Sequence, residues 1–323
     1  MIDKTAMIAI VGRPNVGKST LTNRLTGEKV SIVTPKPQTT RNRIFGVFTY
    51  SGTQMILLDT PGFHKARTRL GEYMVGVVRQ SVADVDAAAL LVEPVDDIGT
   101  QEELLIRHIS SSGVPLILAI NKIDTIKPNL VLPIIERYSN RYGFDAVVPV
   151  SARTGDGVSQ LTEVFARYAK EGPQLFPDGM VTDQPEKEII AELIREKLLI
   201  CLEREVPHGT AVEIVKFSER DAYRNPAGKG PVKSGGGHAS GVRDADIDQS
   251  VIIDVEATIY CEKKSHKGMI IGKNGAMLKK VGQLAREDIE RFMGAKVNLQ
   301  TWVKVRENWR DNQGIMRNLG YVK

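Results

Sequence analysis

The residues near the start of the chain that are best suited to chemistry read GRPNVGKST, residues 12–20. They follow an apolar run and precede a helical pattern, which is the context in which a phosphate-binding loop works. Gly12 and Gly17 let backbone N–H groups turn toward phosphate oxygens at the start of a helix. Lys18 is expected to reach the β- and γ-phosphates of a nucleotide, and Ser19 to ligate Mg²⁺. The other loop residues expected to contact the nucleotide are Arg13, Pro14, Asn15, Val16 and Thr20.

A second chemical segment, DTPGF at residues 59–63, follows the apolar run QMILLD. Asp59 is expected to hold Mg²⁺ through a water molecule, and the Gly62 N–H to meet the γ-phosphate. Phe63 occupies the position where many nucleotide-hydrolysing switches carry a glutamine that orients the attacking water. A phenylalanine ring cannot hydrogen-bond water, so hydrolysis is predicted to be slow. Thr60 and Pro61 complete this segment of the nucleotide site.

A polar loop, PKPQTTRNR at residues 35–43, lies between these two segments. We interpret it as a switch loop in which Thr39 or Thr40 completes the metal shell only when the γ-phosphate is present. Thr40 is the favoured ligand. The alternative interpretation is an ordinary surface loop.

Two further segments predict which base is bound. NKID at residues 121–124 and SAR at 151–153 each follow an apolar strand pattern. The Asp124 carboxylate can accept hydrogen bonds from guanine N1–H and from its exocyclic amine, whereas adenine offers no matching donors. The remaining expectations are that Asn121 ties this loop to the phosphate loop, that the Lys122 stem packs on the base, that the Ala152 N–H meets guanine O6, and that Ser151 and Arg153 complete the site.

The elements that must position these segments alternate between strand and helix. Near-continuous apolar strands separated by helices predict an α/β domain with a mostly parallel sheet covered by helices on both faces. Together with the nucleotide segments above, this indicates a P-loop NTPase G domain. Its motifs then lie at the carboxyl ends of strands, where such sheets bind ligands. The expected strands are 6–12, 54–59, 87–94, 115–122 and 146–151, and the expected helices 18–27, 69–82, 100–112, 128–143 and 158–172.

The pattern changes after residue 172. We predict a G domain at 1–172, a Pro- and Gly-rich linker at 173–184, and an α+β domain with a C-terminal tail at 185–323. In the second domain the expected helices are 186–205, two pieces around GKNG and a final one at 307–320, and the expected strands 209–217, 250–262 and 296–306. The Gly-rich connection at 224–248 is expected to be mobile.

The GKNG segment, residues 272–275, lies between two helical patterns in a basic part of the chain. Residues 262–323 carry 14 Lys and Arg against 6 Asp and Glu, although the whole chain has a net charge of only +5. This arrangement resembles a type II KH domain, whose GxxG loop clamps a single-stranded RNA backbone. The alternative is a helix–turn–helix corner with solvated lysines. The residues expected to bind RNA are Lys267, Gly272, Lys273, Asn274, Gly275, Lys279 and Lys280.

Other residues carry less information. Trp302 and Trp309 are expected to pack in the core or against a groove wall rather than stack on bases. Cys201 and Cys261 form no metal-ligand pattern, which favours a reducing compartment. The N-terminus lacks a signal-peptide layout, and no apolar run has the length of a membrane span, so a cytoplasmic location is expected.

Together these segments resemble one family, the bacterial Era GTPases, in order and spacing over essentially the whole chain. The resemblance implies a monomeric GTPase that uses GTP, GDP and Mg²⁺ and assists assembly of the small (30S) ribosomal subunit. Its KH domain would bind 16S rRNA near the 3′ end in the GTP state and release it after hydrolysis; no DNA binding is implied. The resemblance also implies peripheral contact with the inner face of the cell membrane. The connection at 224–248 is longer than the family pattern.

The resemblance bears on Phe63 as well. Related GTPases with a hydrophobic residue at this position use a phosphate-loop asparagine to bind K⁺, and Asn15 occupies that position. Lys18, Asn15 and the Gly62 N–H are therefore the expected catalytic groups, with stimulation by K⁺ or by rRNA. The alternatives are an RNA-binding scaffold in which the nucleotide is structural, a metabolic P-loop kinase, and a translation or secretion GTPase. The segments at 121–124 and 151–153 disfavour the kinase.

Overall fold

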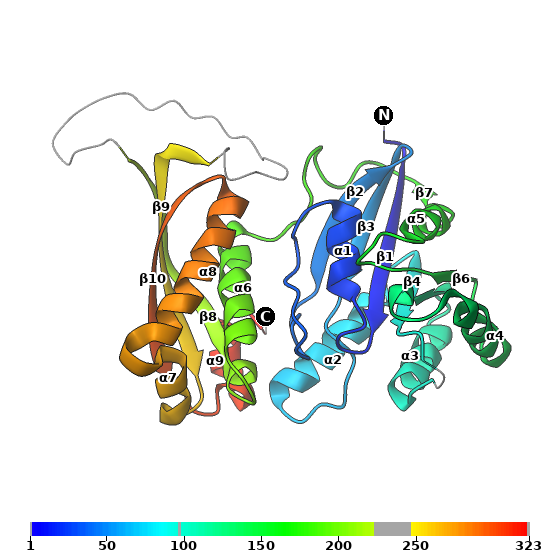
Figure 1. Cartoon of the computed structure of the whole chain (residues 1–323). Helices are drawn as coiled ribbons and strands as arrows, with labels where there is room; N and C mark the ends of the chain where they lie inside the picture. Colours follow the sequence, from blue (N-terminus) through cyan, green and yellow to red (C-terminus); the bar gives the residue numbers. More distant parts are fainter. Residues whose placement is uncertain (1, 96–97, 223–246, 322–323) are drawn as a thin grey trace. The chain divides into compact units, whose positions relative to one another are not determined.

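The computed structural model describes residues 2–95, 98–222 and 247–321, which form two compact units, Met1–Asp183 and Gln184–Lys323 (Figure 1). Most of the Gly-rich connection expected at 224–248 lies outside the described residues. Residues 173–183 belong to the first unit, where they are hydrogen-bonded to its edge. The Val47 N–H donates to the Val181 carbonyl over 2.8 Å, and the Gln54 amide donates to the Phe176 carbonyl over 2.8 Å.

The described part of the first unit contains a seven-stranded sheet in the order β2-β3-β1-β4-β5-β6, with β7 paired to β1. All pairs are parallel except β2 with β3 and β7 with β1. The strands β2 and β7 were not among the expected elements. The bounds are β1 Lys4–Gly12, β2 Ile44–Tyr50, β3 Thr53–Asp59, β4 Ala87–Val92, β5 Leu116–Ile120, β6 Ala146–Pro149 and β7 Lys170–Glu171.

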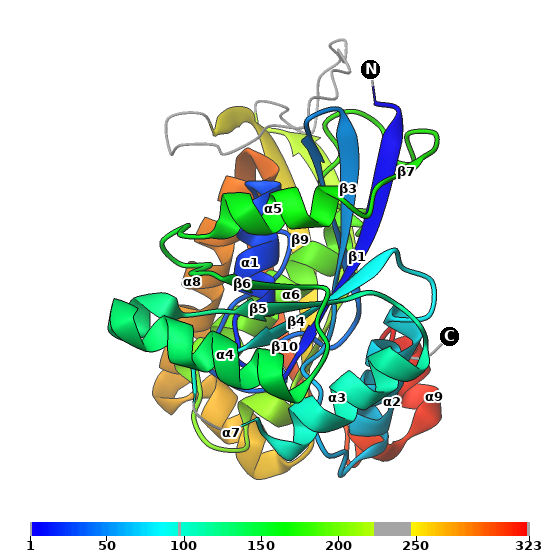
Figure 2. The same cartoon turned by 90° about the vertical axis from the view of Figure 1, so that its right-hand side faces the viewer.

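Helices cover both faces of this sheet, as expected. The helices are α1 Lys18–Thr26, α2 Arg69–Ser81, α3 Thr100–Ser111, α4 Val131–Arg141 and α5 Val158–Ala166. One core packs Leu21 of α1 and Phe165 of α5 against β1, and the other packs the opposite sheet face against α2, α3 and α4. Figure 2 shows α5 on one side of β4–β6 and α3 and α4 on the other. Each nucleotide segment therefore emerges at the carboxyl end of a strand.

The second unit contains α6 Glu186–Cys201, β8 Ala211–Asp221, β9 Asp248–Cys261, α7 Lys264–Ile271, α8 Ala276–Met293, β10 Ala295–Val305 and α9 Gln313–Asn318. Its described strands form a mixed sheet in the order β10-β9-β8, with β9 antiparallel to β8 and parallel to β10. In Figure 1, α6 and α8 run side by side along one face of this sheet. The prediction of a G domain followed by a type II KH domain is confirmed.

Several details differ from expectation. The final helix expected at 307–320 is interrupted at Asn312, whose side chain caps α9 by accepting from the Ile315 N–H. Trp309 is fully buried, as predicted for core packing, and donates to the Gly209 carbonyl, whereas Trp302 is 44% exposed and is not a core residue. Among the residues described, no helix combines the length and apolar character needed to cross a membrane.

Candidate functional site

The phosphate loop connects β1 to α1 and depends on its two glycines. Gly12 and Gly17 have φ angles of 150° and 101°, in the region that side-chain-bearing residues rarely adopt. A Cβ on Gly12 would lie 2.4 Å from the Leu91 carbonyl oxygen, and one on Gly17 would lie 2.2 Å from the Asn121 amide nitrogen. Neither position tolerates a larger residue in this conformation, which supports the interpretation of the loop as a tight backbone cradle.

Lys18, at the first position of α1, points back over this loop. Its ammonium donates to the carbonyls of Gly12 over 3.2 Å and Arg13 over 2.8 Å, and the residue is only 6% exposed. Burial lowers the pKa of Lys18 to about 8, although the nearby Asp59 carboxylate opposes the shift. The cation is thus held inside the loop at the place where a nucleotide's phosphates are expected.

Asp59, at the end of β3, is fully buried. Neither of its carboxylate oxygens has a hydrogen-bond partner among the described residues. Burial raises the pKa of this carboxyl, and Lys18 counteracts the rise. A buried carboxylate without a hydrogen-bonding donor is costly unless a cation compensates it.

The hydroxyls of Ser19 and Thr40 lie 3.0 Å apart and add two oxygen ligands to this region. Mg²⁺ prefers oxygen ligands of this kind, so the residues present fit a magnesium site. Thr39 differs from its neighbour, because its hydroxyl donates to the Lys36 carbonyl over 2.7 Å and lies 2.7 Å from the Thr34 hydroxyl. The geometry therefore supports Thr40 rather than Thr39 as the switch-loop ligand.

A cavity of about 510 Å³ lies between the phosphate loop and the switch loop. Asn15 joins the two walls, because its amide donates to the Pro35 carbonyl over 2.8 Å. The lining residues are Pro14, Asn15, Gly17, Lys18, Ser19, Thr20, Ile32, Val33, Thr34, Pro35, Gln38, Thr39, Thr40, Gly62 and Lys122.

The segment after Asp59 is anchored to the phosphate loop. The Thr60 hydroxyl donates to the Ile10 carbonyl over 2.7 Å, and the Phe63 N–H donates to the Gly12 carbonyl over 3.0 Å. Gly62 lies against Pro14 so closely that a Cβ there would come within 2.7 Å of the Pro14 Cα. The Phe63 ring is 8% exposed and belongs to the apolar core that contains α2 and α3. Its side chain therefore serves packing in this structure.

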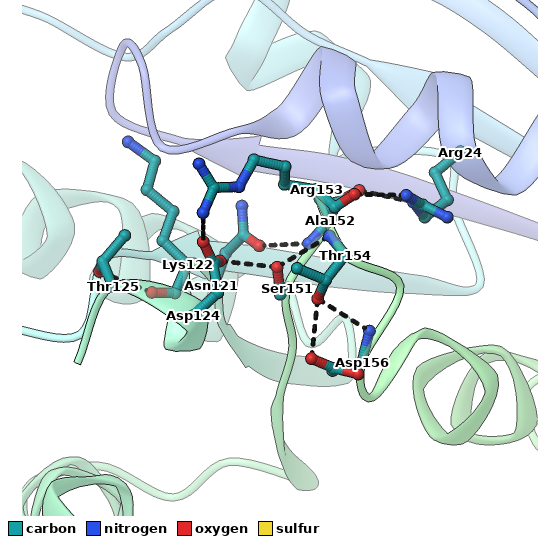
Figure 3. Close-up of polar contacts among 10 residues, drawn as sticks. All are labelled: Arg24, Asn121, Lys122, Asp124, Thr125, Ser151, Ala152, Arg153, Thr154 and Asp156. Atoms are coloured by element: carbon teal, nitrogen blue, oxygen red, sulfur yellow. Dashed lines mark hydrogen bonds and ion pairs between the residues drawn. The ribbon is translucent and has the colours of Figure 1, made fainter. Parts of the chain in front are cut away.

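The base-recognition loops meet at the ends of β5 and β6 (Figure 3). Asp124 accepts from the Ser151 hydroxyl over 2.6 Å and from the Arg153 guanidinium over 2.5 Å. The Ser151 hydrogen bond, helped by Arg153, lowers the pKa of Asp124, so this carboxylate is ionised at neutral pH. Asn121 donates to the Val16 carbonyl over 2.7 Å, which ties the two loops together as predicted.

Two contacts in these loops involve groups that were expected to meet the base. The Ala152 N–H donates to the Asn121 amide oxygen over 2.9 Å rather than remaining available to guanine O6. The Lys122 ammonium forms an ion pair with Glu93, which fixes the end of the side chain expected to pack on the base. In both cases a neighbouring polar group from another strand end supplies the partner.

Two residues that support the nucleotide-binding loops were not predicted from the sequence. Arg24 of α1 donates to the Ala152 carbonyl over 2.7 Å and so supports the loop after β6 (Figure 3). Glu102 of α3 is buried and forms an ion pair with Arg13 of the phosphate loop. Nothing in the periodicity of either helix marks these residues, because charged side chains on a surface helix are usually solvated.

The GxxG segment of the second unit forms the expected turn between α7 and α8. Gly272, Asn274 and Gly275 have φ angles of 74°, 52° and 77°. A Cβ on Gly272 would lie 2.9 Å from the Met277 backbone nitrogen, so the turn requires glycine there. Residues 273–275 form a single 3₁₀ turn before α8 begins. The backbone is therefore open to close approach by a ligand.

The lysines predicted to contact RNA surround this turn. Lys267 lies on α7, Lys273 in the turn, and Lys279 and Lys280 in the first turns of α8; all four side chains are exposed. Cations next to an open glycine turn suit a nucleic-acid backbone. One face of α8 is apolar, with Val281, Ala285 and Ile289 buried.

Comparison with known proteins agrees with both units. Residues 7–122 match the family described as 50S ribosome-binding GTPase, and residues 239–310 match the KH domain family. GTPase Era of Ruminiclostridium cellulolyticum is 44% identical over 318 residues, covering 98% of this chain and 97% of that protein. GTPase Era of Caldanaerobacter subterraneus subsp. tengcongensis is 44% identical over 322 residues, covering 100% of this chain and 99% of that protein.

Two solved structures are also similar. One is Era in complex with MgGDPNP and nucleotides 1506–1542 of 16S ribosomal RNA, at 34% identity and a TM-score of 0.86, covering 99% of this chain and 100% of that one. The other is a single-residue variant of Aquifex aeolicus Era bound to GDP·AlF4⁻, at 34% identity and a TM-score of 0.87, with the same coverage. Matches of this identity over the full length leave one conclusion: this chain belongs to the Era GTPase family, with a P-loop GTPase domain followed by a KH domain.

Proposed function

We propose that this chain is a slow GTP-hydrolysing switch that binds 16S rRNA near its 3′ end through the KH domain and acts in assembly of the small ribosomal subunit. In this account the GTP-bound form holds the RNA, and hydrolysis releases it. Hydrolysis then works as a timer for an RNA-folding step rather than as a metabolic conversion.

The observation that carries the proposal is the group formed by Lys18, Asp59 and the Ser19–Thr40 pair. Lys18 and Ser19 lie at the start of α1, Asp59 at the end of β3 and Thr40 in the switch loop. They supply a buried cation, a buried carboxylate without a hydrogen-bond partner among the described residues, and two hydroxyls 3.0 Å apart. A purely structural phosphate site does not need a buried carboxylate. A site that senses a third phosphate through a metal ion does.

Mg²⁺ would be held by Ser19 and Thr40, with Asp59 acting through water, and when bound it supplies positive charge beside the β- and γ-phosphates. The protein's own groups do the rest. Lys18 is preoriented by two backbone carbonyls and offers its ammonium to the phosphate oxygens. The Gly62 N–H, supported by Pro14, is the proposed contact to the γ-phosphate. Such preorganised donors stabilise the charge that develops during phosphoryl transfer.

Guanine selectivity is proposed to rest on Asp124. A hydrogen bond from Ser151 orients this carboxylate and lowers its pKa, so it is ionised at neutral pH. Guanine places two N–H donors where a carboxylate can accept them, whereas adenine would leave the carboxylate without partners. This argument favours a GTPase over a P-loop kinase that uses ATP.

The RNA part of the proposal is supported by the GxxG turn with its exposed lysines and by the relative that was solved with nucleotides 1506–1542 of 16S ribosomal RNA. The residues proposed to contact RNA are Lys267, Gly272, Lys273, Asn274, Gly275, Lys279 and Lys280. Their placement suits clamping of a single-stranded backbone at the start of α8.

Slow hydrolysis and a cation requirement belong to the same proposal. Phe63 occupies the position of a water-orienting glutamine but packs in the core, so another group must position the water. Asn15 is the proposed K⁺ ligand, since it already contacts a switch-loop carbonyl and such oxygens suit a hard cation. Hydrolysis by Asn15→Ala, measured in potassium and in sodium buffers, tests this point. If the hydrolysis rate of Asn15→Ala equalled that of wild type in both buffers, Asn15 would not be the K⁺ ligand.

Membrane contact, a cytoplasmic location and a monomeric state stay predictions. They rest on the resemblance and, for the location, on the sequence patterns described above, and no geometry of the described residues adds support for contact with a membrane surface.

The test of the proposed function is nucleotide turnover with and without an RNA fragment from the 3′ end of 16S rRNA. We expect slow release of phosphate from GTP, no measurable turnover of ATP, and loss of GTP turnover in Lys18→Ala. The competing scaffold hypothesis predicts tight GTP binding without phosphate release in either condition. That result would exclude the switch.

A further inference from the structure

Glu102, in the first turn of α3, is a buried carboxylate outside the predicted nucleotide site. It is 1% exposed, and its Oε1 forms an ion pair with the Arg13 Nε. Its Oε2 has no hydrogen-bond partner within the described residues. Burial raises the pKa of Glu102, and Arg13 opposes the shift. A carboxylate in this setting costs stability, since its charge is only partly compensated.

The surroundings leave room for this carboxylate. Gly99, which precedes α3, has no side chain, and a Cβ there would lie 2.6 Å from the Glu102 Oε2. Tyr138 of α4 is 1% exposed, and burial together with Glu102 raises its pKa to about 12. The Glu102 carboxylate is therefore enclosed by the protein next to Gly99 and Tyr138, unlike a carboxylate on the solvent-exposed face of a helix.

Arg13 connects this carboxylate to the phosphate loop. Its guanidinium pairs with Glu102, while its own carbonyl accepts the Lys18 ammonium over 2.8 Å. The next residue, Pro14, supports Gly62, whose Cβ position lies 2.7 Å from the Pro14 Cα. The backbone of Arg13 and Pro14 thus contacts both proposed phosphate-sensing groups, Lys18 and Gly62, and the buried Glu102 holds the Arg13 side chain.

We propose that Glu102 is a positioning residue for GTP hydrolysis, acting through Arg13 to hold the backbone that orients Lys18 and supports Gly62. The inference rests on the proposed function and extends it to a residue outside the nucleotide-binding motifs. The physical reason is preorganisation. A phosphate loop that is held in place by the Arg13–Glu102 ion pair does not have to rearrange when charge develops on the γ-phosphate. A stability cost at one position in return for a rigid site is a common feature of functional sites.

The distinguishing experiment compares Glu102→Gln with wild type in GTP turnover and in thermal unfolding without nucleotide. The amide keeps the size of the side chain and removes the buried charge. We expect kcat to fall about tenfold or more, as is typical when a supporting partner of a site is removed. We also expect the Tm to stay the same or rise, because a costly buried charge is gone. The control is Glu136→Gln, an exposed carboxylate on α4, which should change neither quantity.

Arg13→Ala is a second variant that removes the Arg13–Glu102 ion pair, and it does so without changing a residue of α3. It should reproduce the loss of kcat, and the double variant Arg13→Ala/Glu102→Gln should be no worse than either single one, because both substitutions remove the same ion pair. Arg13→Lys should recover part of the rate by restoring a cation next to the carboxylate.

The outcomes separate this inference from the proposed function. If wild type hydrolyses GTP and Glu102→Gln hydrolyses it equally fast, the positioning role is wrong while the proposed function stands. If kcat falls only in parallel with Tm in both single variants, Glu102 is merely structural and the inference is overturned. If wild type shows no GTP turnover with or without RNA, the proposed function fails and the inference fails with it.

Discussion

The hydroxyl of Ser19 in the phosphate loop lies 3.0 Å from the hydroxyl of Thr40 in the switch loop, although the two residues are 21 positions apart in the chain. Thr40 is 6% exposed, so it is held inside the site rather than on the loop surface. This contact links the part of the chain that binds phosphate to a part expected to move when the third phosphate is lost. It is the structural basis of the switch in this account.

Thr40→Ala should weaken Mg²⁺-dependent binding of a non-hydrolysable GTP analogue while leaving GDP binding nearly unchanged. The reason is that Thr40 is proposed to complete the metal shell only in the triphosphate state. Titration with fluorescent nucleotides, with and without Mg²⁺, measures both affinities. Thr39→Ala is the matched control and should have little effect, because the Thr39 hydroxyl bonds within its own loop. Equal effects of the two substitutions would contradict the assignment of the ligand.

Asp124→Asn should lower GTP affinity by about 1–3 kcal/mol for each guanine donor left without an acceptor. The amide offers one donor and one acceptor where guanine needs two acceptors. Isothermal titration with GTP and ATP measures the change and the remaining selectivity. Asp156→Asn is the control, because Asp156 lies in the same loop cluster but bonds to Thr154 (Figure 3). If Asp124→Asn kept the same selectivity for GTP over ATP, Asp124 would not be the residue that recognises the base.

The stability of the nucleotide-free protein should contain a pH-dependent contribution from Glu102. Burial raises the pKa of its carboxyl above the ordinary value of 4.5, and the groups facing it are Arg13, which opposes the rise, and Glu93, which adds to it. Tyr138 also packs nearby and stays neutral at these pH values, since its pKa is raised. Between the unfolded and folded pKa values the folded state binds more protons, so this contribution to unfolding free energy falls as pH rises.

Glu102→Gln removes this titration. Its unfolding free energy, measured by denaturant titration from about pH 4.5 upward, should fall less with increasing pH than that of wild type. The Glu136→Gln variant should follow the wild-type curve. Parallel curves for wild type and Glu102→Gln would show that the Glu102 carboxyl is not perturbed by burial.

Lys273→Ala should weaken RNA binding without unfolding the KH domain. The side chain is exposed in the GxxG turn, so its removal changes charge rather than packing. If Lys273 neutralises one phosphate, the slope of log K against log salt concentration should become shallower by about 1. Fluorescence anisotropy with a single-stranded 16S rRNA fragment measures this slope. Lys187→Ala, an exposed lysine of α6 away from the turn, is the control and should leave the slope unchanged.

The order of elements and the positions of the motifs could be predicted, because local patterns determine them. An apolar run of strand length or a pair of phosphate-binding glycines is determined by residues that are adjacent in the sequence, so it can be recognised without knowing the fold. The edge strand β2 was harder to predict, since Gly46 interrupts its pattern. That glycine is explained only by the folded state, where a Cβ would lie 2.8 Å from the Thr22 Cγ2 of α1.

Contacts between distant charged residues could not be predicted from the sequence. The Arg13–Glu102 and Lys122–Glu93 pairs depend on which strand ends become neighbours in the sheet. The exposure of Trp302 has a similar origin: alternation in β10 places Val303 against the helices and Trp302 on the opposite face, which the described helices do not cover. An aromatic residue type alone does not reveal which face it occupies.

The central claim is that the phosphate held by the GTPase domain controls RNA binding by the KH domain. The most direct measurement is the affinity of the full chain for a 16S rRNA 3′ fragment in three states: without nucleotide, with GDP, and with a non-hydrolysable GTP analogue and Mg²⁺. We expect the tightest binding with the GTP analogue and clearly weaker binding with GDP. The same affinity in all three states would contradict it.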